Sequence, residues 1–594
     1  MKIVVLVKQV PRPDSIEFDE ETKSLKREGV PLELNPFDAA AVQDAARLRD
    51  AVGGEVVAMT MGPPQAEDAL RLCLALGADR CVHLSDRAFA VADTIGTSRT
   101  LALAIAREGA DLVICGRKTV DSETWQVPPE VGAFLGLPSL TSVTGIEPAG
   151  ERLLVTRETD EGSERYEVPL PAVLSLARAG EPTSGEGADG RIDLWTAADL
   201  VGDVRPNDKR FGQTGSPTRV LAVRDVTPPR AGTRALTSSE AADLLEAKLE
   251  ETRLSDSEWE KPERLGEQPG ASYDCWTVVE LVDGRPARLS LELLGKGREL
   301  AGKLGGQNVA LVIGSELGGA AREATRFGAD RVVLVEDERL ARYHPELFAA
   351  AVRGVLERER PHVLLVPSTA NGRDYGPRAA GELELGMTGD CVGLGIDRGG
   401  RLIQTKPAYG GNIVSVIMGS TTPQLASVRA RMFEPLRPRD DAKAEIVRLE
   451  LDDLPEPRVR LVDRQADSPG YRLDEAHVVI VAGPDVGADG IAELDRYATE
   501  VDAALGGTRE VCDAGWLPRN RQVGLYGRPL APRLLVAVEV PGDFEHLTGF
   551  VKAGAIAAIA ADASSPMLDA ADVALVGDWR RLLREVHDAV APRL

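Results

Sequence analysis

The chain has 594 residues, of which 43% are hydrophobic and 28% charged, and its formal net charge is −24. This length exceeds what one hydrophobic core usually serves, so we expect three or more domains in a protein of ordinary globular composition. The negative charge argues against nucleic acid or an anionic membrane surface as the main partner, and no apolar run approaches the roughly 20 residues of a membrane span.

The first 116 residues alternate short apolar runs with longer amphipathic stretches. Residues 56–62, 80–86 and 111–116 are apolar runs of strand length. Residues 64–78 and 94–110 carry apolar side chains at helical spacing. Continuous apolar strands that alternate with helices predict a parallel sheet that is buried on both faces, and therefore an α/β fold.

The second part of the chain repeats the first. "LALGADRCVHL" (74–84) is answered by "TRFGADRVVLV" (325–335), and "VAMTMG" (57–62) by "VALVIG" (309–314). The matched segments keep their order at an offset of roughly 250 residues, which indicates a duplicated domain. Four more apolar runs after residue 476 predict a third α/β unit.

Two polar stretches divide the chain. Both are rich in charged residues and contain proline, so they read as a linker and a connector. The predicted units are residues 1–245, a linker at 246–272, residues 273–437, a connector at 438–475, and residues 476–594.

The cysteines and the N-terminus bear on the compartment. The six cysteines are scattered, without a C-x-x-C pair, which predicts neither a disulfide framework nor a zinc site. The opening "MKIVVLVKQVP" lacks the long apolar stretch and cleavage site of a signal peptide. These features predict a cytoplasmic protein.

Ligands of parallel α/β sheets bind beyond the carboxyl ends of the strands, so the loops there are the places to search. In the first unit, the loop 115–129 contains Asp121, Ser122, Thr124 and Gln126, which would suit a sugar or phosphate at a helix N-terminus. The same residues also suit ordinary helix capping. "NPFD" (35–38) is likewise a nucleotide-facing turn or a simple cap.

Loops of the other two units are less specific. Residues 369–380 stand where 117–129 stand in the first unit, and the glycines of 408–413 suit either a ligand or a tight domain interface. The third unit offers 508–516, 521–527 and 540–549, where His546 alone is more often structural than functional. No phosphate-binding, nucleophile-elbow or metal motif is present. From the residues alone, the chain is a binder of a ligand the size of an adenine nucleotide.

Several segments resemble electron transfer flavoprotein. "NPFDAAAVQDAARL", "ADTIGTSRTLALAI" and "VDSETWQVPP" are similar to the beta subunit. Residues 276–436, with "NGRDYGPRAA" and "KPAYGGNI", are similar to the N-terminal domain of the alpha subunit. Residues 476–594, with "TREVCDAGW", "HLTG" and "ADVALVGD", are similar to its C-terminal flavin domain. The resemblance implies a beta–alpha fusion, with two homologous doubly wound parallel-sheet domains and a third α/β flavin-binding domain.

What the resemblance implies is an electron carrier rather than a catalyst with its own substrate. FAD in the third unit would take electrons from flavin dehydrogenases and pass them to a membrane quinone oxidoreductase. The first unit would hold AMP or a second FAD, and self-association stays open. The residues implied for the third-unit site are Thr508, Arg509, Gln522, Val523, Gly524, Leu525, Tyr526, Pro541, Gly542, His546 and Asp578. Those implied for the first-unit site are Asn35, Pro36, Phe37, Asp38, Asp121, Thr124 and Gln126, within loops that extend from Arg117 to Val127 on one side.

The implied chemistry is electrostatic. A reduced flavin carries negative charge, which a guanidinium at Arg509 and a donor at His546 would stabilise. No acid, base or nucleophile is needed, which agrees with the absence of a catalytic motif.

The chain also departs from the family pattern in its flavin motifs. Tyr526 replaces a threonine, Glu539 and Pro541 replace a glycine and a serine, and Glu545 replaces a glutamine. A turn with a phosphate-facing arginine becomes "AGPDVG" (482–487), and an asparagine becomes Ala560. Added carboxylates and lost donors oppose a bound pyrophosphate. The alternative is therefore a paralogue with a weakened flavin site and a structural or regulatory role. The acidic segment 177–195, which stands where the family has a basic recognition loop, argues against an acyl-CoA dehydrogenase as partner.

Overall fold

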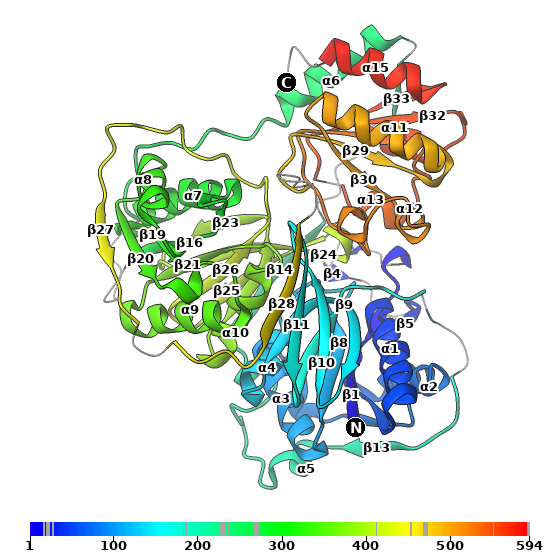
Figure 1. Ribbon diagram of the computed structural model, residues 1–594, viewed down its shortest axis with the longest axis vertical. Helices are drawn as coiled ribbons and strands as arrows, with labels where there is room; N and C mark the ends of the chain where they lie inside the picture. The colour runs from blue at the N-terminus through cyan, green and yellow to red at the C-terminus, as the bar shows by residue number, and fades with distance from the viewer. Residues whose placement is uncertain are drawn as a thin grey trace.

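The chain folds into three α/β units (Figure 1). The computed structural model describes residues 1–15, 18–19, 24–25, 29–181, 183, 187–225, 230, 232–235, 237–265, 273–411, 413–451, 454–466, 473–550 and 552–590. Each unit is built on its own sheet, and helices cover both faces of the two large sheets. The predicted fold class is confirmed.

The first unit has a ten-stranded sheet in the order β13-β7-β6-β1-β8-β12-β9-β10-β11-β28. Strands β13 to β9 in this order pair in parallel, and the remaining three are antiparallel. Ile3 and Val5 of β1 pack under α1 and α2, while Val4 and Leu6 pack under α3 and α4, as strand alternation requires. The strands are β1 (Lys2–Leu6), β6 (Glu55–Met61), β7 (Arg80–Leu84), β8 (Leu112–Gly116), β9 (Ser139–Ala149), β10 (Arg152–Glu158), β11 (Gly162–Pro169), β12 (Ala172–Leu176), β13 (Ile192–Trp195) and β28 (Arg460–Ala466). The helices are α1 (Pro36–Val52), α2 (Glu67–Ala75), α3 (Thr94–Glu108), α4 (Val127–Leu135) and α5 (Ala197–Val201).

The second unit repeats this topology. Its seven strands are all parallel, in the order β22-β26-β21-β16-β19-β20-β27. Each strand corresponds to the strand at the same position in the order β9-β12-β8-β1-β6-β7-β13 of the first unit, when the strands of each unit are numbered along the chain. The duplication read from the sequence is therefore a duplication of fold. The strands are β16 (Cys275–Val279), β19 (Asn308–Gly314), β20 (Arg331–Glu336), β21 (Val363–Pro367), β22 (Met387–Cys391), β26 (Gln424–Val428) and β27 (Glu445–Arg448). The helices are α7 (Arg288–Leu304), α8 (Gly318–Arg326), α9 (Pro345–Glu359) and α10 (Gly372–Glu382).

The third unit is a six-stranded parallel sheet in the order β15-β33-β32-β31-β29-β30. Three helices, α6, α11 and α15, cover one face, and loops with α14 cover the other. The strands are β15 (Thr233–Arg234), β29 (Val478–Ala482), β30 (Ala504–Gly507), β31 (Leu534–Val538), β32 (Ala555–Ala560) and β33 (Val573–Val576). The helices are α6 (Ser238–Glu251), α11 (Gly487–Glu500), α12 (Arg509–Asp513), α13 (Phe544–Leu547), α14 (Pro566–Ala570) and α15 (Trp579–Val590).

Segments near the expected boundaries cross between units. β14 (Thr218–Asp225) joins a four-stranded antiparallel sheet with β23 (Gly393–Ile396), β24 (Leu402–Ala408) and β25 (Ile413–Gly419) of the second unit. β15 and α6 lie on the third unit, where Leu245 and Leu249 enter its core. β28, from the expected connector, is the edge strand of the first sheet. The segments are short and depend on a partner unit for burial, which is why the sequence alone placed the boundaries elsewhere.

Candidate functional site

The predicted site residues of the first and third units meet at one interface. The loops after β30 and β31 of the third unit face the loops before α1 and after β8 of the first unit (Figure 1). The rings of Phe37 and Tyr526 pack edge to face with their centroids 6.3 Å apart. Nη2 of Arg117 donates a hydrogen bond of 2.9 Å to the carbonyl oxygen of Tyr526. The interface therefore joins the two predicted sites directly.

Arg509, the first residue of α12, lies at the centre of this interface. Its guanidinium stands over the ring of Tyr526, 5.4 Å from the centroid. It also pairs with Glu181 at 2.6 Å and with Asp513 at 3.3 Å. A cavity of about 10 Å³ beside it is lined by Arg509, Arg519, Gln522 and Tyr526 together with residues of the first unit. Such a volume holds about one water molecule.

Tyr526 is buried, with 6% of its surface exposed. Its hydroxyl donates a hydrogen bond of 3.1 Å to Oε1 of Glu545. Burial raises the pKa of the Glu545 carboxyl, since the charged form is less well solvated there. Leu525 and Tyr526 share an apolar cluster with Val10 and Phe37. The ring is thus held by packing from both units and by one hydrogen bond.

His546, on α13, is buried on the same side of the third unit. Its Nε2 lies 3.5 Å from a carboxylate oxygen of Glu510. This contact is the largest of the causes that lower the pKa of Glu510 to about 2. Nδ1 of His546 is buried and makes no hydrogen bond with the part of the chain that the structure describes. One ring nitrogen therefore has unused hydrogen-bonding capacity.

The other predicted third-unit residues differ in burial and in their contacts. Thr508 is buried before α12, and Gln522, Val523 and Gly524 are buried in the loop that precedes Tyr526. Gly542 has φ +89°, and an added Cβ would lie 2.3 Å from the amide nitrogen of Met567, so packing on α14 requires glycine there. Pro541 is half-buried, and Asp578 is exposed and accepts a hydrogen bond from the amide of Arg580.

Acidic side chains dominate the carboxyl edge of the third sheet. The carboxylate of Glu539 accepts a hydrogen bond of 3.0 Å from the amide of Ala561. Burial raises the pKa of Glu539, and the neighbouring carboxylates Asp485, Asp562 and Asp578 raise it further. These four acids make the edge unfavourable for an anionic pyrophosphate.

In the first unit, Asn35 and Asp38 brace the loops around them. Asn35 donates to the carbonyl oxygen of Lys118 at 3.0 Å and accepts from the amide of Val120 at 3.2 Å. Asp38 accepts from the amides of Lys8 and Gly116. Burial raises the pKa of Asp38 to about 7 despite these hydrogen bonds. Pro36, at the first position of α1, accepts through its carbonyl oxygen from the amide of Gly180.

The remaining first-unit residues are also engaged by the protein. Asp121 pairs with Lys8 at 2.5 Å. Gln126 donates to the carbonyl oxygen of Met387 at 3.0 Å, which ties α4 to the second unit. Thr124 packs against Gly389, where an added Cβ would lie 2.6 Å from the Thr124 carbonyl oxygen. The structure thus brings these residues together, with their side chains or backbone used within the fold.

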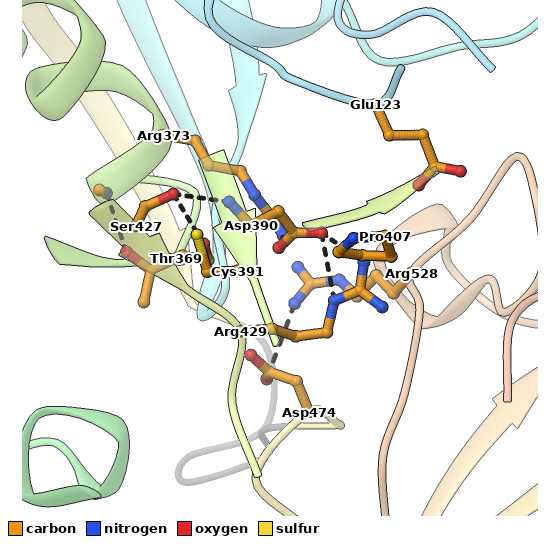
Figure 2. A network of polar contacts seen from close by, with 12 residues as sticks. Glu123, Thr369, Arg373, Asp390, Cys391, Pro407, Ser427, Arg429, Asp474 and Arg528 are labelled. Carbon is orange, nitrogen blue, oxygen red and sulfur yellow. Dashed lines mark hydrogen bonds and ion pairs between the residues drawn. The ribbon is translucent and has the colours of Figure 1, made fainter. Parts of the chain in front are cut away.

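Sequence reasoning missed a cluster of buried charges where the three units meet. Figure 2 shows Asp390, at the end of β22, beside Arg373 and Arg429. Asp390 is 1% exposed and accepts from Nη2 of Arg373 at 2.9 Å and from Nε of Arg429 at 3.1 Å. We call these three residues the Asp390 cluster. Burial raises the pKa of Asp390, but the two guanidinium groups lower it far more, so the group is ionised. The signal in the sequence was an acid inside the apolar run "MTGDCVG" (387–393), because a buried acid requires partners.

Neighbouring charges extend this arrangement to the other units. Arg528 of the third unit pairs with Asp160 of the first at 2.8 Å, and Asp474 lies 3.8 Å from it (Figure 2). Lys118 pairs with Glu123 at 3.4 Å, both buried. The Arg528–Asp160 pair therefore fastens the third unit to the first.

Two kinds of site are missing from the described parts of the chain. No group of three or more His, Cys, Asp or Glu side chains there could hold a metal ion. Nor is any described helix both long and apolar enough to cross a membrane.

Comparison with known proteins identifies the units. The model of the electron transfer flavoprotein domain matches residues 22–200 and again 275–454, and the model of the electron transfer flavoprotein FAD-binding domain matches residues 472–551. The chain belongs to the electron transfer flavoprotein family. The repeated match agrees with the duplicated topology of the first two units.

Relatives of this flavoprotein cover different parts of the chain. The electron transfer flavoprotein subunit beta of Thermoanaerobacterium thermosaccharolyticum is 39% identical over 236 residues, 39% of this chain and 91% of that protein. The subunit alpha of the same organism is 31% identical over 314 residues, 52% of this chain and 95% of that protein. The caffeyl-CoA reductase-Etf complex subunit CarD of Acetobacterium woodii is 37% identical over 263 residues, 43% of this chain and all of that protein. The expected beta–alpha fusion is confirmed.

The FAD-binding domain match supports FAD as the cofactor, and the residues can be tested against it. The donors fit, because Arg509 and His546 lie on the side of the third unit that faces the first. Nδ1 of His546 makes no hydrogen bond with the described residues, although a carboxylate oxygen of Asp543 lies 3.9 Å from it. The ring of Tyr526 lies against the guanidinium of Arg509 and occupies space that a flavin ring would need there. The donors therefore suit the flavin ring of FAD once the Tyr526 side chain has moved, whereas the four acids at the edge of the third sheet oppose its pyrophosphate.

Proposed function

We propose that the chain carries electrons with FAD held by its third unit. The observation that carries the proposal is the placement of Arg509 and His546 at the interface with the first unit, within a domain that matches the flavoprotein FAD-binding domain. When bound, FAD supplies reversible uptake of electrons. Thr508, Arg509, the segment 522–525 and His546 would hold it.

The role of the protein in this proposal is electrostatic. The Arg509 guanidinium supplies a fixed positive charge, and Nδ1 of His546, which makes no hydrogen bond with the described residues, would supply a hydrogen bond toward a developing negative charge. The first unit closes the site from the other side through Phe37 and Arg117. No side chain has to transfer a proton or attack a substrate.

Donors, acceptors and compartment follow from the family resemblance. We propose flavin-containing dehydrogenases as donors and a membrane quinone oxidoreductase as acceptor, both in transient contact. The six cysteines, all buried and unpaired by disulfides, support a reducing compartment such as the cytoplasm.

A nucleotide in the first unit is part of the same proposal. AMP or a second FAD would lie against the loops 35–38 and 117–127. Asn35 donates a hydrogen bond to the carbonyl oxygen of Lys118, and Asp38 accepts one from the amide of Gly116, which supports a preorganised pair of loops there. Mass spectrometry of ligands released on denaturation tests which nucleotide is present.

A second candidate function is a flavin-weakened paralogue with a structural or regulatory role. Two observations favour it: the Tyr526 ring against Arg509, and the four carboxylates along the edge of the third sheet. The absorption spectrum of the purified chain separates the two candidates. Visible flavin bands, present as purified or after incubation with FAD, support the carrier, and a chain that stays colourless supports the paralogue.

The Arg509→Ala substitution tests the site itself. Loss of the guanidinium should lower FAD occupancy or make the flavin potential more negative, because a reduced flavin loses its stabilising charge. Redox titration of the substituted chain beside the unsubstituted one measures this. Full occupancy with an unchanged potential would place the flavin away from Arg509.

A further inference from the structure

We propose that Tyr526 limits flavin binding in this chain, because its ring lies on the face of Arg509 that a flavin ring needs. The inference rests on the proposed function in one respect, the choice of FAD as ligand. It concerns a single side chain, and it can be tested whether or not the unsubstituted chain proves to be an electron carrier.

The position of the ring is the first argument. One face of a guanidinium group can stack on only one aromatic ring at a time. On Arg509 the ring of Tyr526 occupies such a face, with its centroid 5.4 Å from the guanidinium carbon. The neighbouring cavity of about 10 Å³ has room for about one water molecule. A three-ring flavin and the Tyr526 ring therefore compete for the same place.

The second argument is that the ring is packed from both units. Tyr526 is 6% exposed and meets Phe37 of the first unit edge to face. Val10, Val120 and Ala179 of the first unit belong to the same apolar cluster. Releasing the ring exposes this apolar surface to water or to the ligand, which opposes FAD binding.

The third argument is that only the side chain has to move. The carbonyl oxygen of Tyr526 is held by Arg117, and the amide of Leu525 donates to the carbonyl oxygen of Glu545 at 2.8 Å. These bonds fix the backbone of the loop. The side chain beyond them is tied by one hydrogen bond, to Glu545, so a smaller residue at 526 would open the site and leave the loop in place.

The experiment compares FAD binding by full-length chains that have been freed of flavin. The variants are Tyr526→Thr, which removes the ring, and Tyr526→Phe, which keeps the ring but removes the hydroxyl. Tyr497→Thr is the matched control, because Tyr497 is a buried tyrosine of α11, away from the interface with the first unit. Quenching of FAD fluorescence on titration gives the dissociation constant, and circular dichroism checks the fold. Tyr526→Val replaces Tyr526→Thr if the threonine variant does not fold.

We expect Tyr526→Thr to bind FAD at least about tenfold more tightly than the unsubstituted chain. Tyr497→Thr should stay within about twofold of it, and Tyr526→Phe should gain far less than Tyr526→Thr, since the ring at 526 is kept in both. Equal affinity of Tyr526→Thr and the unsubstituted chain, whether both bind or neither binds, overturns the inference. An affinity gain in Tyr526→Phe as large as that in Tyr526→Thr also overturns it, because the hydroxyl and not the ring would then be the obstacle.

The outcomes also separate this inference from the proposed function. If only Tyr526→Thr binds FAD, the inference stands and the electron-carrier proposal fails. If both bind equally tightly, the carrier proposal stands and the inference fails.

Discussion

Two regions of this molecule place arginines against acids where units meet, and they do so in different ways. In the Asp390 cluster, Asp390 is 1% exposed and its partner Arg429 8%. At Arg509, the guanidinium is 16% exposed, but its acid partner Glu181 is 82% exposed and Asp513 39%. In the first pairing both partners are buried. In the second, Arg509 is largely buried, whereas its acid partners are exposed to water.

The difference distinguishes charges that stabilise the fold from charges that are available to bind a ligand. A buried pair that loses one partner leaves an uncompensated charge, so the Asp390 cluster has little freedom to exchange partners. An exposed acid such as Glu181 is solvated with or without Arg509, so releasing it costs little. Arg509 can therefore accept another anionic partner, which is what a ligand site requires.

The largest expected effect comes from breaking the buried pairing. Asp390→Asn removes the carboxylate that pairs with the guanidinium groups of Arg373 and Arg429 in the interior. We expect a loss of about 3–5 kcal/mol in the stability of the second unit. Scanning calorimetry should then show a melting transition lowered by roughly 10 °C.

A matched substitution on the surface tests whether burial is the reason. Asp397 pairs with Arg401 at 2.6 Å, and Arg401 is 55% exposed. Asp397→Asn should change stability by less than about 1 kcal/mol. Equal losses of stability in Asp390→Asn and Asp397→Asn would mean that burial does not explain the contribution of the Asp390 cluster.

The sequence predicts the architecture better than the site, for a physical reason. Apolar periodicity and the repeat at 74–84 and 325–335 report which faces are buried, and burial determines the sheets. The Asp390 cluster and the Tyr526–Phe37 contact join residues far apart in the chain, and no local pattern records such pairs. The resemblance to a family indicated Arg509 and His546, but the side-chain packing that covers Arg509 is visible only in the fold. The placement of α6 on the third unit escaped prediction for the same reason.

Glu130 provides a further contrast with Asp390, because the described part of the chain pairs no cation with this buried acid. Glu130 of α4 is fully buried and is bonded by the hydroxyls of Ser98 and Thr94. Burial raises the pKa of Glu130 to about 8, above its ordinary value of 4.5, although both hydrogen bonds lower it. Between these two values the folded chain holds one more proton at this site than the unfolded chain, so stability falls as pH rises, by about 1.4 kcal/mol per pH unit.

The Glu130→Gln variant should remove this fall. At pH 5 the two chains should melt within a few degrees of each other, and at pH 8 the variant should be more stable by a few kcal/mol. Melting temperatures measured from pH 5 to 9 give the two curves. Glu147→Gln, at an exposed acid of the same unit, serves as the control. Parallel curves for Glu130→Gln and the unsubstituted chain would show that Glu130 is not buried in its neutral form.

The smallest effect is expected at the exposed partner of Arg509. Because Glu181 is 82% exposed, Glu181→Gln should alter stability by less than about 1 kcal/mol. It should also strengthen FAD binding by roughly twofold to threefold at low salt, since Arg509 loses a competing anion, and this gain should fade at high salt. Calorimetry and FAD titration at two salt concentrations measure both quantities. If Glu181→Gln lost as much stability as Asp390→Asn, the Arg509 pairing would also stabilise the fold. The distinction between the two regions would then disappear.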